Sequence, residues 1–564
     1  MTVPNAVVDA WLAQDPDPVT RRALVELRQR AATDEAAAAE LADAFDGTLS
    51  FGTAGLRGAL GPGPNRMNRV VVMRAAAALA AFLHDHDQPG PPGPPRPHDQ
   101  PTVAGQRRTV VVGHDARHGS YDFARDSAAV LAGAGFEVLL FDRPVPTPLV
   151  PFLVLAQGCA GGVVVTASHN PATDNGYKVY LGDGCQLVSP ADSEIAAHID
   201  RLASTPVDQL PRGDAVRLIG DAEAEAYLAA ITADLPDGPR KVRWVHTALH
   251  GVGSATMVAA AARAGFDAPS QVASQRDPDP GFPTVGFPNP EEPGALDRAL
   301  ALAAELDAQV VIANDPDADR LAVAVPRHGG PGCGGWRQLT GDEVGVLLAD
   351  DLLRRGVTGT LATTVVSSTM LAEVAAAYGR PVTTTLTGFK WLGRVPGLVF
   401  AYEEALGYCC TPAVVRDKDG IAAALRILAL VADLAAHGQS LTDRLAELTD
   451  RFGAHASDQL SRRLTDRSAA ESIMERLRAT PPTQLAGQPV TCTDLADGGD
   501  DLPPTDALVL TGDSVRVVVR PSGTEPKLKC YLQVRERPGA ERGRTRARER
   551  LAALRTDVGQ LVTP

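Results

Sequence analysis

The sequence predicts an α/β protein built from several domains. Short Val-rich runs alternate with Ala- and Leu-rich segments of helical period, a pattern typical of βαβ units. The chain has 564 residues, well beyond the size at which one hydrophobic core stops growing. Hydrophobic residues make up 44% of it and charged residues 22%, as in ordinary globular proteins. We therefore expect three consecutive, similar α/β domains followed by a smaller α+β domain.

The first α/β domain is predicted over residues 1–210. Its expected elements, in order, are a helix near 73–83, a strand at 109–112, a helix at 121–132, a strand at 138–141, a weaker helix at 149–155 and a strand at 162–165. Residues 84–107 lie between the first helix and the first strand and are rich in Pro and Gly. This composition excludes a packed element and predicts a mobile surface insertion rather than a domain boundary.

Two further α/β domains are predicted over residues 211–330 and 331–455, and a C-terminal domain over 456–564. The third domain contains expected strands at 361–365 and 398–401 and a long helix at 420–436. The last segment differs from the others, because strands at 515–519 and 528–534 are followed by an Arg-rich helix. That order favours an α+β fold.

The composition limits the classes of molecule that the protein is expected to bind and the cellular compartment in which it is expected to work. The net charge is −14, from 54 basic and 68 acidic residues, so no global field favours nucleic acid or an anionic membrane. No apolar run approaches the roughly 20 residues that span a bilayer, and the N-terminal stretch lacks a signal-peptide pattern. The seven Cys include no Cys-x-x-Cys pair, which fits a reducing compartment. We expect a cytoplasmic protein, in which an anionic substrate would need a local cluster of Arg and Lys.

A polar loop joins two apolar runs in VVVTASHNPATDNGYKVY, residues 163–180. Ser168 and His169 stand side by side where the first run ends. Ser168 could be an activated nucleophile, although the Gly neighbours of an α/β-hydrolase elbow are missing. The alternative, which this stretch alone slightly favours, is a turn in which Ser and Asn side chains bond nearby backbone groups.

Three carboxylates follow a strand in VVIANDPDADRLAVAV, residues 310–325. Asp315, Asp317 and Asp319 would repel one another, and a bound divalent cation is the simplest way to offset that repulsion. A calcium loop of the EF-hand type is excluded, because its sixth position would be Arg320 and its twelfth Pro326. All-oxygen ligands suit a hard ion, so we expect a Mg²⁺ site rather than a solvated acidic turn.

These stretches resemble motifs of the α-D-phosphohexomutase superfamily, which includes phosphoglucomutases and phosphomannomutases. TASHNP is similar to the phosphoserine loop of that family and DPDADR to its metal loop. Four further stretches match in the family's order: FGTAGLRG (51–58), GFKWLG (388–393), AYEEALGY (401–408) and RPSGTEPK (520–527). The resemblance implies four domains around a central cleft, each contributing one loop. The stretch FAYEEALGYCCTPAVVRDKDG (400–420) is most similar to the corresponding sequence of the family branch that acts on glucose and pentose phosphates.

The resemblance implies a covalent mechanism. Ser168 would carry a phosphoryl group, pass it to the 6-hydroxyl of a sugar 1-phosphate, and receive the other phosphate back from the 1,6-bisphosphate intermediate. Such a bisphosphate would also serve as activator. Mg²⁺ would be held by Ser168, Asp315, Asp317 and Asp319. The expected activity is the interconversion of hexose 1-phosphate and hexose 6-phosphate, with glucose or mannose as the sugar.

Roles for single residues are implied in the same way. Arg57 and Lys178 would lie near the phosphoserine, and either Lys178 or His169 would accept the proton. The sugar would be bound by Arg320, Gly388, Lys390, Glu403 and Lys418. The phosphate that does not react would be bound by Arg520, Ser522, Gly523 and Thr524, a set that supplies N–H groups and a guanidinium to an anion.

One departure from the family leaves the substrate open. The family's sugar loop usually carries Ser two places after its first Glu, where this chain has Ala405, which cannot donate a hydrogen bond to a sugar hydroxyl. Glucose, mannose, ribose and deoxyribose phosphates all stay possible. The alternatives are therefore a phosphopentomutase, a sugar-1,6-bisphosphate synthase, a Mg²⁺-dependent phosphatase and a non-catalytic sugar-phosphate-binding protein. The intact Ser168 and the aspartate triplet argue against the last. Either a monomer or a homodimer is compatible with the sequence.

Overall fold

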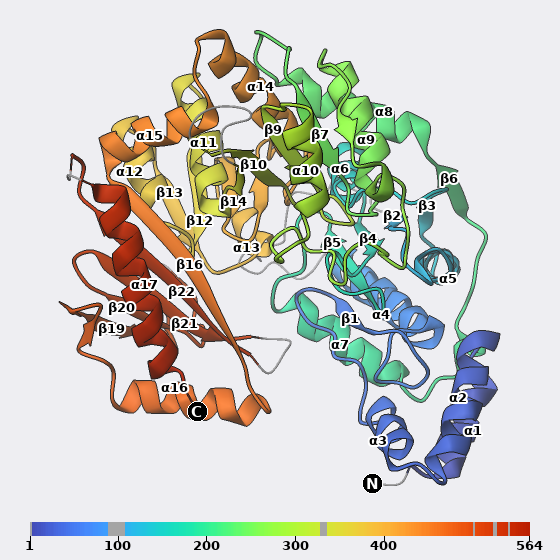
Figure 1. Ribbon diagram of the computed structural model, residues 1–564. Helices are drawn as coiled ribbons and strands as arrows, with labels where there is room; N and C mark the ends of the chain where they lie inside the picture. The colour runs from blue at the N-terminus through green and yellow to red at the C-terminus, as the bar shows by residue number, and fades with distance from the viewer. Residues whose placement is uncertain are drawn as a thin grey trace. The chain divides into compact units, whose positions relative to one another are not determined.

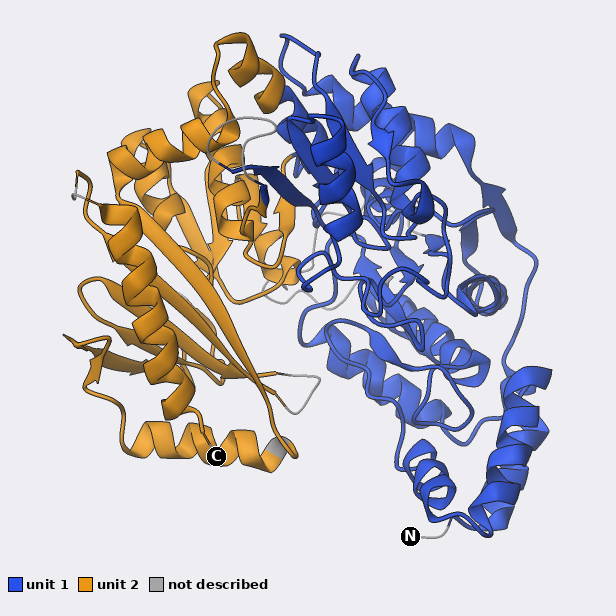
Figure 2. Cartoon of the chain, viewed as in Figure 1, with its two compact units in different colours: residues 1–336, 411–429 blue, residues 337–410, 430–564 orange. Residues whose placement is uncertain are grey.

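The chain forms two compact units in a computed structural model (Figure 2). The structure describes residues 3–87, 108–327, 335–499, 502–522, 527–539 and 542–563. The first unit comprises Met1–Trp336 and Thr411–Ala429, and the second Arg337–Cys410 and Leu430–Pro564. The boundaries of the four predicted domains stay predictions.

The first unit begins with three helices that were not predicted: α1 (Asn5–Gln14), α2 (Pro18–Ala31) and α3 (Glu35–Ala44). Carboxylates cap two of them, because Asp17 accepts the N–H of Val19 and Asp34 that of Ala36. The apolar faces of the three helices share a core with α4 (Arg69–Asp87). The predicted insertion at 84–107 therefore starts too early, since 84–87 are the last turn of α4, and 88–107 lie outside the described residues.

A six-stranded sheet follows in the order β1-β5-β4-β2-β3-β6. Its strands are β1 (Leu56–Ala59), β2 (Thr109–His114), β3 (Glu137–Phe141), β4 (Gly161–Val165), β5 (Asp174–Leu181) and β6 (Val216–Ile219). Strands β2, β3, β4 and β6 are parallel, whereas β5 is antiparallel to both β1 and β4. One face packs on α4, α5 (Ser120–Gly133) and α7 (Ala191–Leu202), and α6 (Leu149–Gln157) packs on the other (Figure 1). The elements predicted here from the sequence are confirmed.

The same unit contains four strands of a second, five-stranded sheet, in the order β8-β7-β9-β10. These strands are β7 (Trp244–Thr247), β8 (Ser270–Gln271), β9 (Val310–Ala313) and β10 (Ala322–Pro326), accompanied by α8 (Asp221–Ala233), α9 (Gly253–Arg263), α10 (Asp297–Glu305) and the short helical turn Ala273–Gln275. The helical turn Val207–Gln209 belongs instead to the core that α1–α4 share. Strands β7, β8 and β9 are parallel, and β10 returns antiparallel to β9. The predicted aspartate loop is the connection between β9 and β10.

The second unit contains two larger sheets. A four-stranded sheet has the order β13-β12-β14-β15, and an antiparallel five-stranded sheet has the order β16-β22-β21-β20-β19. The first sheet is built from β12 (Thr360–Thr364), β13 (Val382–Thr385), β14 (Leu398–Glu403) and β15 (Gly407–Cys409), with α11 (Gly341–Arg354), α12 (Met370–Ala377), α13 (Phe389–Leu392) and α15 (Leu441–Phe452). The second is built from β16 (Ala454–Arg463), β19 (Thr491–Asp494), β20 (Leu508–Thr511), β21 (Val515–Pro521) and β22 (Lys527–Glu536), with α16 (Arg467–Ala479) and α17 (Gly543–Leu561).

The remaining elements are β11 (Trp336–Gln338), the hairpin of β17 (Gln484–Leu485) and β18 (Gln488–Pro489), and α14. Helix α14 runs over Gly420–Ala436, as predicted, and its residues are shared between the two units. In the part of the chain that the structure describes, no single helix has the length and apolar composition to cross a membrane. Helices α14 and α15 reach the required length and apolar composition only when they are taken together, and the chain bends by 87° between them.

Candidate active site

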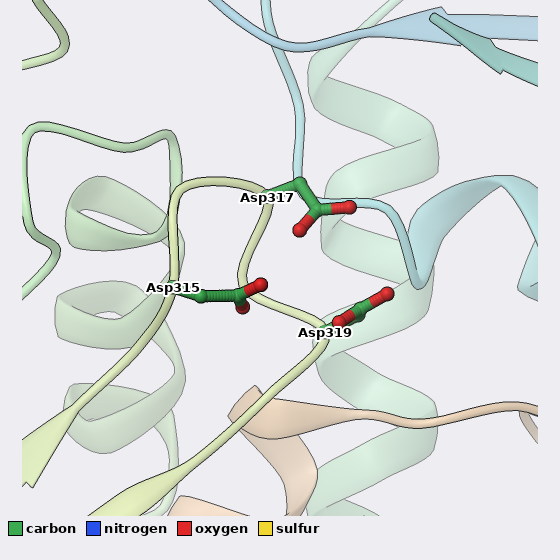
Figure 3. Close-up of side chains that lie close together, drawn as sticks. All are labelled: Asp315, Asp317 and Asp319. Carbon is green, nitrogen blue, oxygen red and sulfur yellow. The ribbon is translucent and has the colours of Figure 1, made fainter. Parts of the chain in front are cut away.

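Three buried carboxylates converge in the loop between β9 and β10 (Figure 3). Asp315, Asp317 and Asp319 each place one oxygen within 4.8 Å of the others, and none of the three is exposed to solvent. Among the described residues, no group donates a hydrogen bond to Oδ1 of Asp317 or Oδ1 of Asp319. Buried acceptors are normally satisfied, so these orphaned oxygens fit the ligand set of a hard divalent cation.

The three carboxyl groups differ in their electrostatic environment. Burial, and then the charges of the other two carboxylates, raises the pKa of Asp315 well above its usual range. Burial also acts to raise the pKa of Asp317 and of Asp319, but the Lys178 ammonium outweighs it and both pKa values are lowered. Lys178 Nζ donates to Asp317 Oδ2 and to Asp319 Oδ2, each at 2.7 Å. The first carboxyl is thus the one most easily protonated, and the other two stay ionised.

Ser168 directs its hydroxyl at this acidic centre. Its Oγ donates to Asp315 Oδ2 at 2.8 Å and lies 3.2 Å from Nδ1 of His169. The backbone of Ser168 is left-handed, with φ of 52°, a conformation that costs energy for a residue other than glycine. The Ser168 N–H donates to Thr166 Oγ1 at 2.8 Å. The capped-turn and nucleophile interpretations of the sequence are therefore compatible, because the turn presents the hydroxyl.

His169 and Lys178 differ as candidate proton acceptors. Burial, together with the nearby Arg320 and Arg57 charges, lowers the pKa of His169 well below its usual value, so its ring is neutral. Burial acts to lower the pKa of Lys178 as well, but Asp317 and Asp319 outweigh it and the pKa is raised. An ammonium that stays protonated can only donate. Of the two, only His169 is an uncharged base beside Ser168 Oγ, so these charge states favour His169 as the acceptor.

Three further predicted cations of the first unit lie at the same place. Lys418 Nζ is 3.4 Å from Asp319 Oδ2. The pKa of Arg57 is lowered by burial and then by the charge of Arg320, and its Nη1 donates to Asn170 Oδ1 at 3.4 Å. The backbone N–H of Arg320 donates to Asp315 Oδ1 at 3.0 Å. The cationic cluster that an acidic chain would need for an anionic substrate is present.

Sequence reasoning missed several residues that support the centre. Thr147 Oγ1 donates to Asp317 Oδ2 at 2.6 Å, and its N–H donates to the Asp317 carbonyl at 2.9 Å. Asp417 accepts from the Tyr180 hydroxyl and the Gln186 amide, both at 2.7 Å, beside Lys418. Asp417 could have been found, because it neighbours a predicted site residue in RDKDG, whereas nothing in the local sequence marks Thr147.

A tight turn after β7 packs against Pro316 in the aspartate loop. The N–H of Val252 donates to the Pro316 carbonyl at 2.8 Å. A Cβ added to Gly251 would lie 2.3 Å from the Cα and the carbonyl oxygen of Pro316. Only glycine allows the two backbones to approach this closely.

The described sugar- and phosphate-binding residues predicted in the second unit lie at the start of α13, at the end of β14 and at the end of β21. Gly388, with φ of 104°, precedes α13, on which Lys390 lies, and Glu403 ends β14. Arg520, on β21, donates from Nη1 to Thr387 Oγ1, so the phosphate loop adjoins the residue before Gly388. The Ser522 N–H donates to the Lys527 carbonyl at 2.8 Å. Gly523 and Thr524 lie outside the described residues.

Glu404, next to Glu403, is a half-buried and unusually weak acid. Burial, and then the charges of Glu403 and Asp342, raises the pKa of Glu404 to about 7. Its Oε2 accepts hydrogen bonds from Ser367 Oγ at 3.1 Å and Thr364 Oγ1 at 3.2 Å. These hydroxyls come from the last residue of β12 and from the turn that follows it.

A serine hydroxyl bonded to one carboxylate of an all-oxygen acidic centre is the arrangement that the resemblance to the α-D-phosphohexomutase superfamily implies. The comparisons with known proteins agree. Four family models match in order: phosphoglucomutase/phosphomannomutase alpha/beta/alpha domain I over residues 98–205, domain II over 225–330, domain III over 340–452, and the C-terminal domain over 462–550. The chain belongs to the phosphoglucomutase/phosphomannomutase family, and the predicted enzyme class is confirmed.

Relatives are similar over nearly the whole chain. A probable phosphomannomutase of Haemophilus influenzae is 44% identical over 83% of this chain and 93% of its own length. Human phosphopentomutase is 33% identical over 94% and 91% of the two chains, and human glucose 1,6-bisphosphate synthase is 32% identical over 94% and 90%. The crystal structure of a putative phosphomannomutase from Thermus thermophilus superimposes with a TM-score of 0.68 at 26% identity, covering 91% of this chain and 99% of the other.

We predict that Gly251→Ala weakens divalent-metal binding about 10- to 100-fold, the usual effect of disturbing the support of metal ligands. The added Cβ would force Pro316, and with it the neighbouring aspartates, to move. Titration calorimetry with Mn²⁺ measures the change. Gly286→Ala is the matched control, because a Cβ there meets nothing within 4 Å. Equal affinities of both variants would show that the turn does not position the loop.

We also predict a pH-dependent effect of Glu404→Gln. The pKa of Glu404 is about 7 in the folded chain and 4.5 ordinarily, so the stability that depends on its protonated form is lost as pH rises from about 4.5 through about 7. The variant should therefore raise Tm above that of wild type at about pH 8 but not at about pH 4. Scanning calorimetry checks this, with Glu471→Gln on an exposed face of α16 as control. A Tm difference that is the same at both pH values contradicts the prediction.

Proposed function

We propose that the chain moves a phosphoryl group reversibly between the 1- and 6-positions of a hexose phosphate, through a phosphoserine at residue 168. One observation carries the proposal: the buried Ser168 hydroxyl donates at 2.8 Å to Asp315, within an acidic centre that has unsatisfied oxygens. A phosphoryl group on Oγ would bring anionic oxygens to that centre. The phosphosugar mutases among the relatives support the same chemistry.

The residues present fit a Mg²⁺ ion. Asp315, Asp317 and Asp319 would hold it together with the Ser168 phosphoryl oxygens, because hard cations prefer such ligands. When bound, the ion would neutralise charge on the transferred group. Lys178, which donates to two of these carboxylates, would as an ammonium add positive charge beside the phosphoryl group.

The remaining steps fall to side chains that orient the substrate and accept a proton. His169, neutral and with Nδ1 3.2 Å from Ser168 Oγ, would take the proton of the attacking hydroxyl. Arg57, Arg320 and Lys418 would orient the phosphoryl group and the sugar, since phosphoryl transfer depends on alignment and charge stabilisation.

The second unit would supply the binding of the sugar and of the phosphate that does not react. Glu403, with two acceptor oxygens, would bind sugar hydroxyls, and Lys390 would contact the substrate's anionic part. The phosphate would be bound by Arg520, Ser522, Gly523 and Thr524, with Gly388 closing the adjacent loop. Escape of the bisphosphate would leave Ser168 without its phosphoryl group, so a sugar 1,6-bisphosphate would act as activator. A cytoplasmic monomer or homodimer acting on small sugar phosphates fits this proposal.

Phosphopentomutase activity is the second candidate. Human phosphopentomutase matches 94% of this chain, and Ala405 offers no hydroxyl to discriminate among sugars. The same serine and acidic centre would serve both activities.

We predict that wild type isolated after incubation with glucose 1,6-bisphosphate is about 80 Da heavier than the bare chain, the mass of one phosphoryl group. Ser168→Ala should lack this addition and lose mutase activity at least about 10⁴-fold, because the covalent route is gone. Intact-protein mass spectrometry and a coupled assay of glucose 6-phosphate formation measure both. Ser193→Ala, at an exposed position of α7, is the control. Release of free phosphate instead of the isomer would identify a phosphatase, and turnover by Ser168→Ala would refute the covalent step.

We predict that Ala405→Ser sharpens sugar discrimination by about tenfold in kcat/KM, the value of roughly one hydrogen bond. Wild type and variant are compared with the 1-phosphates of glucose, mannose, ribose and deoxyribose. Ala413→Ser, at an exposed position, controls for the substitution itself. A uniform change for all four sugars would show that residue 405 does not read the sugar.

A further inference from the structure

One buried arginine holds the backbone of the serine loop, residues 168–174. Arg117 Nη2 donates to the carbonyl oxygens of Ser168 at 2.5 Å and Asn170 at 2.6 Å. Its Nη1 donates to those of Pro171 at 2.7 Å and Asp174 at 3.2 Å. Only 4% of the residue is exposed. A single planar guanidinium therefore satisfies acceptors along the length of the loop.

Arg117 is fixed in place from its other side. Asp115 Oδ2 lies 3.2 Å from its Nε, and Asp115 Oδ1 accepts the Arg117 N–H at 3.0 Å and the Ser120 hydroxyl at 2.6 Å. The guanidinium carbon lies 4.9 Å from the ring centre of Phe282, a cation–π contact. The Arg117 side chain, on the turn after β2, is thus held by contacts that do not involve the serine loop.

The loop needs such a support at Ser168. A left-handed backbone at a residue other than glycine costs on the order of 1–3 kcal/mol and persists only where surrounding contacts fix it. Thr166 bonds the N–H of Ser168 and Arg117 its carbonyl, so both sides of the residue are held. The direction of Oγ follows from that backbone conformation.

We infer that Arg117 is a positioning residue, which holds Ser168 so that its hydroxyl faces Asp315. This inference rests on the proposed function for its catalytic consequence. Arg117 itself makes no bond to Oγ; it acts through the loop carbonyls. Lysine cannot replace it, because one ammonium lacks the planar fork of donors that spans these acceptors.

Amide hydrogen exchange of the full-length chain tests the positioning without reference to activity. Arg117→Lys should accelerate exchange over 168–174 at least about tenfold and leave β4 protected, since only local opening is affected. Arg125→Lys, an exposed residue of α5, is the matched control and should match wild type. If Arg117→Lys does not fold, Asp115→Asn, which loosens only the far side of Arg117, should still accelerate exchange in the loop. Unchanged loop exchange in the folded variant overturns the inference.

Phosphoryl loading and kinetics test the consequence for the reaction. Arg117→Lys should take up the phosphoryl group from glucose 1,6-bisphosphate about 100-fold more slowly and lower kcat to match, with KM within about threefold of wild type, because alignment and not substrate affinity is lost. A general structural defect would change KM and Mn²⁺ affinity too. Wild-type kcat in Arg117→Lys overturns the inference and leaves the proposed function standing. Absence of loading and turnover in wild type overturns the proposed function, while the exchange experiment still decides the role of Arg117.

Discussion

The concentration of three carboxylates in one buried loop is the constraint on which the first unit depends. Isolated buried charges are costly unless they are paired. Asp315, Asp317 and Asp319 come from a single connection, so their partners must come from elsewhere in the chain. Lys178 lies 139 positions from Asp317, and Lys418 lies almost 100 positions beyond Asp319. The fold brings these distant cations to the acids.

The sheet topology explains how they meet. The serine loop and the Arg117 turn follow the carboxyl ends of the adjacent parallel strands β4 and β2, so they emerge at one edge. Antiparallel pairing of β5 with β4 returns Lys178 opposite Val164, close to the loop that has just left the sheet. The backbone register of β4 and β5 alone therefore brings Lys178 close to Ser168.

Much of this could be predicted from the sequence, because the chemistry is concentrated in short stretches. The TASHNP and DPDADR loops, the strands that carry them and helix α14 are where the patterns predict them. Three N-terminal helices were missed, and residues 84–87 are helical where an insertion was expected. Arg117 was missed for a different reason: its acceptors are backbone carbonyls, which leave no mark on the sequence. The arrangement of the domains around a cleft stays a prediction.

The division of the chain has a consequence for its biosynthesis. Residues Thr411–Ala429 belong to the first unit although Arg337–Cys410 of the second unit precede them. The Tyr180 and Tyr227 hydroxyls donate to Asp417 and Asp419, which the ribosome adds roughly 190 to 240 positions later. During synthesis, both tyrosine hydroxyls therefore lack these acceptors until residues 337–410 of the second unit have been translated. A nascent chain that ends at residue 336 therefore lacks the acceptors of these two hydroxyls, and the first unit can be completed only after residue 429 has been translated.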